Sequence, residues 1–109
     1  MTAGTFRRLA LKLPHAMEGQ HMEHPDFRVR NKIFATLGPR EELGMVKLTP
    51  EQQKDFMKAE PETFFPCNGA WGRRGATHVR LAEANEKTVR RALDMAWRNV
   101  VPARLARGR

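Results

Sequence analysis

The feature that most constrains the fold is an apolar stripe near the C-terminal end of the chain. Its members recur at helical spacing and are Val89, Ala92, Leu93, Ala96, Trp97 and Val100. Asn85 precedes the stripe and is a good helix N-cap. A stripe of this width has to be buried against another layer of structure. We therefore expect a helix that begins after Asn85 and covers a sheet.

The first half of the chain predicts one helix followed by short strands. The helix is expected from Thr5, as N-cap, to the residue before Pro14, and a short strand over 16–21. Between 26 and 38, apolar and polar residues alternate on both sides of Asn31, which tolerates a left-handed turn, so a β-hairpin is indicated. This alternation places Phe34 on the side opposite to Ile33, Ala35 and Leu37. Gly38-Pro39 marks the next turn.

The second half begins with a strand over 45–48 and a helix whose start is clearly marked. Thr49 is the N-cap, Pro50 suits the first helical position, and Gln52 completes a capping box. This helix is expected to end before Pro61. A half-buried strand follows over 77–81.

The order of these elements predicts an α+β fold. It reads as a helix, three or four strands, a helix, one or two strands and a helix, with about five strands in a mostly antiparallel sheet. A chain of 109 residues is long enough for one core, so a single domain over 1–109 is expected. The basic tail, 102–109, is expected to fray.

Composition narrows the class of partner. The formal net charge is +8, which favours polyanions: nucleic acid first, then acidic proteins or an anionic surface. A chain that is rich in arginine only for solubility is the alternative. Cys67 is the single cysteine, so no internal disulfide is expected, and no long apolar run or signal pattern is visible. We expect a cytoplasmic protein without a membrane contact.

The segment 69–77 combines three glycines with Trp71 and the adjacent pair Arg73 and Arg74. Glycine at this density indicates positive φ angles or a close backbone approach. Arginine forks suit phosphate or carboxylate, and the indole offers a flat apolar face. The segment is interpreted as a loop that presents these side chains to a ligand.

A candidate nucleic-acid interface follows from this loop and the neighbouring strands. It would bind backbone phosphates through cations and stack a base on the indole. Its candidate residues are Arg28, Arg30, Lys32, Lys47, Trp71, Arg73, Arg74, His78 and Arg80. In the alternative interpretation, these are outward residues of half-solvated strands, and Trp71 packs back as a lid on the core. No helix shows an exposed Arg/Asn/Gln set for a major groove, so little sequence specificity is expected.

The sequence offers little support for catalysis or metal binding. His15, His21 and His24 do not follow a ligand scaffold, and no second cysteine assists them. Cys67 would need a positioned base such as His78. The chain has no serine, and the glycines at 69, 72 and 75 are not expected to open a helix as a phosphate loop would. We expect no enzyme activity, no cofactor and no metal.

Four short motifs carry a family resemblance. His24-Pro-Asp-Phe27, Lys32-Ile-Phe-Ala35, Val46-Lys-Leu-Thr-Pro50 and the segment 69–75 occur in the order found in the MmcQ/YjbR family of small bacterial proteins. The chain resembles this family from about residue 6 to about residue 105. The resemblance implies a YjbR-like fold, near the secretion-chaperone-like and CyaY-like architectures, and DNA binding through a "double wing" of β elements. Ala76-Thr77 stands where family members often have a second tryptophan, and Ala70 separates Gly69 from Trp71.

Two functional hypotheses result. The first is a cytoplasmic nucleic-acid-binding protein, with DNA favoured, that contacts phosphates with low specificity. The second is a protein-interaction module that binds an acidic or helical partner, as the chaperone-like architecture suggests. A monomer is the favoured state in both.

Overall fold

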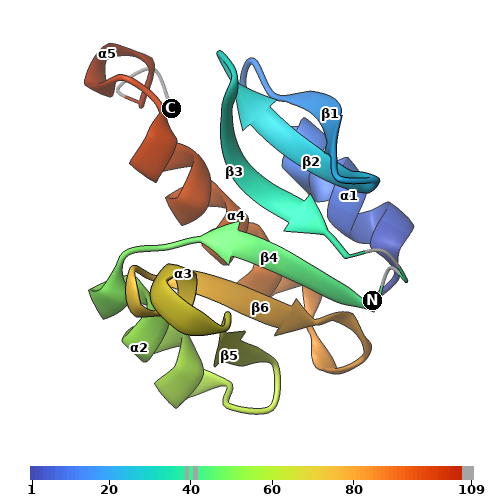
Figure 1. Ribbon diagram of the computed structural model, residues 1–109, viewed down its shortest axis with the longest axis vertical. Coiled ribbons are helices and arrows are strands. Elements are labelled where there is room, and N and C mark those ends of the chain that lie inside the picture. The colour runs from blue at the N-terminus through green and yellow to red at the C-terminus, as the bar shows by residue number, and fades with distance from the viewer. Residues whose placement is uncertain (39, 41, 107–109) are drawn as a thin grey trace.

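The computed structural model describes residues 1–38, 40 and 42–106 and contains one six-stranded sheet (Figure 1). The spatial order of its strands is β1-β2-β3-β4-β6-β5, and every neighbouring pair is antiparallel. The strands are β1 Met17–His21, β2 His24–Val29, β3 Lys32–Leu37, β4 Leu43–Lys47, β5 Phe64–Pro66 and β6 Ala76–Arg80. The α+β class and the antiparallel sheet are confirmed, with six strands where about five were expected.

Helices cover one face of this sheet and part of the other. The helical segments are α1 Ala3–Leu11, α2 Pro50–Ala59, α3 Gly69–Arg73, the 3₁₀ turn η1 Leu81–Glu83, α4 Glu86–Val100 and α5 Ala103–Ala106. In Figure 1, α1 and α4 lie behind the sheet and the short α3 lies in front of β6. Within the described residues, no helix is long and apolar enough to cross a membrane.

The core lies between the sheet and the two helices behind it. Trp97 of α4 is fully buried, and its indole Nε1 donates a hydrogen bond to the carbonyl of Pro14 at 2.9 Å. Phe6 of α1 and Phe27 of β2 pack as tilted rings with centroids 6.2 Å apart. The N-terminal helix is therefore fixed both to the sheet and to the end of α4.

Local signals placed the two long helices correctly. Asn85 caps α4 by accepting a hydrogen bond from the Thr88 amide, and five of the six stripe residues are buried, with Val100 half-buried. At α2, Thr49 and Gln52 form the expected capping box, with bonds of 3.0 and 3.2 Å. The expected cap of the first helix is wrong. Thr2 caps α1, because its hydroxyl accepts from the Thr5 amide, and the helix begins at Ala3.

The predicted hairpin is present, with one irregularity. Arg30 and Asn31 form its turn at φ values of 51° and 68°. A β-bulge lies beside Phe27 and Arg28, and Phe34 is the extra residue of β3. An extra residue breaks the strict alternation of side chains. Phe34 is therefore fully buried, although the alternation predicted the side opposite to Ala35.

Three short elements were not expected. β5 has three residues and ends in Pro66, and α3 occupies the segment that was interpreted as a loop. Residues 103–106 of the basic tail form α5. Pro39 of the predicted Gly38-Pro39 turn and residues 107–109 of the tail lie outside the described residues.

Candidate nucleic-acid interface

The face of the sheet opposite α1 and α4 carries the candidate site. In an antiparallel sheet, directly opposed residues point to the same side. Thr36 opposes Met45, Met45 opposes His78, and His78 opposes Phe65. These side chains share one face, while their neighbours Ala35, Val46 and Val79 belong to the core. The first group therefore forms an open face that α3 covers only in part.

A groove forms where β3 and β4 diverge. The described pairing between these strands covers only Ala35–Leu37 with Gly44–Val46, so the first half of β3 leaves its neighbour. The resulting hollow, here called the split groove, has a volume of about 790 Å³. Its cationic and aromatic lining residues are Lys32, Lys47, Arg74 and Trp71.

The end of α4 closes one side of the split groove. Asn99 donates its side-chain amide to the carbonyl of Lys47 at 2.9 Å and to Oε1 of Gln52 at 2.8 Å. The first bond satisfies a β4 carbonyl at the point where β3 has left the strand. The divergence of the two strands is thereby stabilised.

Gln53 of α2 fixes the position of α3. Its buried side-chain nitrogen donates to the carbonyls of Gly72 and Ala76, each at 3.0 Å, and to the Thr77 hydroxyl at 3.2 Å. An amide nitrogen that lost these acceptors would remain buried without partners. One side chain therefore joins α2, α3 and β6, and it holds Trp71 over the open face.

Two glycines make this packing feasible. A Cβ built on Gly72 would lie 1.7 Å from the carbonyl oxygen of Cys67, and one on Gly75 would lie 2.1 Å from that of Leu48. Gly75 also has a φ of 114°, which L side chains rarely adopt. The sequence interpretation of close backbone approach is confirmed at these positions. Its expectation that the glycines do not open a helix is wrong, because α3 begins at Gly69.

Trp71 is not a lid on the core. Trp71 is 58% exposed, whereas Met45, which lines the same groove, is 4% exposed. The core tryptophan is Trp97. The indole of Trp71 is thus available to a ligand from the open side of the sheet.

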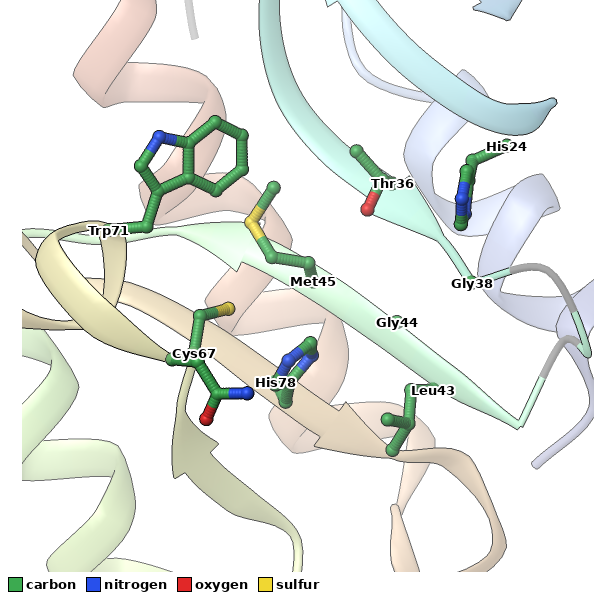
Figure 2. A pocket seen from close by; sticks show the side chains of 10 residues that line it. His24, Thr36, Gly38, Leu43, Gly44, Met45, Cys67, Trp71 and His78 are labelled. Atoms are coloured by element: carbon green, nitrogen blue, oxygen red, sulfur yellow. The ribbon is translucent and has the colours of Figure 1, made fainter. Parts of the chain in front are cut away.

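A second cavity, here called the inner pocket, adjoins the split groove (Figure 2). It has a volume of about 380 Å³ and shares Thr36, Met45 and Trp71 with the groove. Figure 2 shows Trp71 and Met45 toward one end and His24 at the other, with His78 and Cys67 along the side formed by β6 and the segment before α3. Its lining residues are His24, Thr36, Gly38, Leu43, Gly44, Met45, Cys67, Asn68, Trp71 and His78.

Burial changes the protonation of two of these groups. It raises the pKa of the Cys67 thiol to about 11 and lowers the pKa of His78. Nδ1 of His78 is buried and has no hydrogen-bond partner among the described residues. The Phe65 ring packs against the imidazole, with centroids 4.9 Å apart. Near pH 7 the Cys67 thiol is therefore protonated and the His78 imidazole is neutral.

Arg28 is held by a buried carboxylate. Its guanidinium donates to both oxygens of Asp26, at 2.8 and 2.6 Å, and Asp26 is fully buried. The hydrogen bond to Asp26 raises the pKa of Arg28. A buried carboxylate needs such a partner. The main role of Arg28 in this structure is to neutralise Asp26.

The other candidate cations outside the split groove lie at separate places. Arg80 stacks on Phe65, with its guanidinium 4.0 Å from the ring centroid, and donates to the carbonyl of Glu62. Arg30 lies at the hairpin turn beside Arg28, in a separate hollow next to β1. Arg73 is exposed at the end of α3 and lines neither the split groove nor the inner pocket.

Four of the nine candidates thus meet in the split groove: Lys32, Lys47, Arg74 and Trp71. His78 lies in the inner pocket. Across the described part of the chain, Lys32, Lys47 and Arg74 have no ion-pair partner.

The histidines do not meet in a metal site. In the described residues, no group of three or more His, Cys, Asp or Glu side chains is close enough to hold a metal ion. His15 is exposed after α1, and His24 lines the inner pocket. The side chain of His21 lies outside the described part of the structure.

Sequence reasoning missed Gln53 and most of the inner pocket. Gln53 lies three residues before the buried Phe56, so it occupies the apolar face of α2. A polar residue on such a face is a signal that could have found it. Met45 is buried on the open face, and this placement depends on strand register.

Comparison with known proteins agrees with this architecture. The family model YjbR matches residues 11–99, so the chain belongs to the YjbR family. The crystal structure of Deinococcus radiodurans protein DR2400, with a DUF419 domain, has a similar fold, with a TM-score of 0.76 at 18% identity. The match covers 91% of this chain and 78% of that one. No curated protein matches the sequence. The family resemblance expected from the four motifs is confirmed.

Proposed function

We propose that this YjbR-family protein binds nucleic acid without enzymatic activity, and that the split groove is its binding surface. The observation that carries the proposal is the exposed Trp71 indole beside three cations without acidic partners. Cationic side chains bind phosphates through counterion release, and an aromatic face stacks with bases of any sequence. Both interactions favour binding with low sequence specificity.

Of the candidate cations, the proposal assigns phosphate binding only to those that line the split groove. Lys32, Lys47 and Arg74 would contact phosphates, because they line one hollow from β3, β4 and the end of α3. Arg28 and Arg80 are assigned structural roles, since Asp26 and Phe65 engage them.

The absence of catalysis and a cytoplasmic location are part of the same proposal. A thiol with a pKa of about 11 is a poor nucleophile at neutral pH. The high positive charge of the chain would bring it to the nucleic acids of the cytoplasm.

A matched pair of arginine variants tests the proposal. We expect Arg74→Ala to weaken binding of a labelled single-stranded oligonucleotide about fivefold at 0.1 M salt. Each phosphate contact with a single strand contributes about −0.7 to the slope of log affinity against log salt, which corresponds to about that factor at 0.1 M. Arg80→Ala removes the same charge outside the groove and should leave the affinity nearly unchanged. Fluorescence anisotropy titrations measure both. Equal effects of the two variants, or no binding by the wild type at low salt, would contradict the proposal.

The protein-interaction alternative has its own observation. Met17 and Met22 are 68% and 78% exposed, on and after β1, which is an edge strand. An unpaired edge can accept a further strand from a partner. This surface is distinct from the split groove, so Met17→Lys would abolish such a contact without changing oligonucleotide binding.

A further inference from the structure

The inner pocket is next to the split groove but differs from it in chemistry. Both cavities are lined by Thr36, Met45 and Trp71, so a ligand in one can reach the other past the indole. The split groove carries lysine and arginine, whereas the inner pocket is lined by none of Lys, Arg, Asp or Glu. Phosphates are therefore matched to the groove, and an uncharged group is matched to the pocket.

The walls of the inner pocket suit a flat group with polar edges. Leu43, Met45 and Trp71 supply apolar and aromatic surface. Thr36, His24 and Asn68 supply hydrogen-bonding side chains, and His78 adds an imidazole that burial keeps neutral near pH 7. Ligand pockets commonly combine apolar walls with a few polar groups in this way.

We propose that the inner pocket accepts one unpaired base of a single-stranded nucleic acid whose backbone lies in the split groove. This inference rests on the proposed function and names its substrate class. The base would stack against Trp71 and place its polar edges toward Thr36, His24 and Asn68. A base in a duplex is stacked and paired, and cannot enter without being turned out of the helix. The protein should therefore prefer single strands to duplexes.

Three oligonucleotides separate the two parts of this account, and the two single strands among them carry equal charge. The probes are a labelled ten-residue oligothymidine, an abasic strand of the same length, and a ten-base-pair duplex. We expect the oligothymidine to bind roughly tenfold more tightly than the abasic strand, because one base stacked on an aromatic side chain supplies about that factor. We also expect it to bind more tightly than the duplex.

Two variants locate the base. Leu43→Trp would fill the inner pocket from a position outside the split groove, and Trp71→Ala would remove the stacking surface. Each should reduce oligothymidine binding toward the abasic level. Leu43→Trp should leave abasic binding unchanged. Met17→Trp, at an exposed position outside both cavities, is the control and should retain the preference. Asn68 is exposed and lines the inner pocket but not the split groove, so Asn68→Trp tests the same point if Leu43→Trp does not fold.

The outcomes distinguish the base pocket from the proposed binding of nucleic acid in the split groove. Equal binding of the oligothymidine and the abasic strand overturns the base pocket but leaves phosphate binding intact. A preference that survives in folded Leu43→Trp, or in Asn68→Trp where Leu43→Trp does not fold, also overturns it, even if Trp71→Ala removes the preference, because Trp71 lines the split groove as well. Failure of every probe to bind at low salt refutes the proposed function itself.

Discussion

Burial suppresses the one thiol of the chain instead of activating it. Cys67 lies in the inner pocket with His78, a pair of residue types that serves as nucleophile and base in some enzymes. Here the loss of hydration disfavours the thiolate, and the same effect disfavours the protonated imidazole that would stabilise it. Neither Cys67 nor His78 is therefore in the charged form that a reactive thiolate–imidazolium pair would need, and we infer that the inner pocket binds a ligand without reacting with it.

The rate of alkylation tests this protonation state. A shift from 9.0 to about 11 lowers the thiolate fraction at pH 8 about 100-fold. We expect iodoacetamide to label the folded protein that much more slowly than the urea-unfolded protein. The folded rate should rise with pH until about pH 11, because a raised pKa delays ionisation. A folded rate at pH 8 equal to or above the unfolded rate would show an activated thiol.

At the scale of elements, α3 is the part of the site with the strictest backbone requirements. Gly72 and Gly75 leave no room for a Cβ against the backbone of Cys67 and Leu48. Gln53 then anchors the carbonyl of Gly72 to α2. The orientation of Trp71 and Arg74 depends on this packing.

The same substitution at two glycines separates strain from collision. Gly75→Ala should destabilise the protein by at least about 2 kcal/mol, since it adds both a strained φ and overpacking. Gly69→Ala also has positive φ, at 68°, but its Cβ would meet no atom within 4 Å, so a smaller cost of about 1 kcal/mol is expected. Urea unfolding measures both. Equal losses of unfolding free energy in the two variants would show that the collision with Leu48 adds no cost to the strained φ.

The sequence predicted those elements whose signals are local. Asn85 with its apolar stripe, and Thr49 with Gln52, specify helix starts within a few residues, and both helices are where the sequence placed them. β5 and α3 depend instead on distant partners. β5 is short and needs pairing with β6, and α3 is held by a bond from Gln53, nineteen residues away. The burial of Phe34 needed a bulge that periodicity does not reveal.

At the scale of the whole molecule, only some of the candidate cations come together in one groove. The candidate cations from Arg28 to Arg80 do not all line one groove, because Asp26 holds Arg28 and Phe65 stacks with Arg80. The divergence of β3 from β4 brings Lys32 and Lys47 to the same groove as Arg74. Strand register and divergence are tertiary properties, so the sequence identified the cations but not which of them meet.

The salt dependence of single-strand binding tests the central claim most directly. Three phosphate contacts predict that log affinity falls against log salt with a slope of about −2. Replacement of Lys32, Lys47 and Arg74 by alanine should bring the slope close to zero. A control that replaces the exposed Lys12, Lys54 and Lys87 by alanine removes equal charge outside the groove and should retain the slope. A flat response of the wild type, or an equal loss of slope in both triple variants, would contradict binding in the split groove.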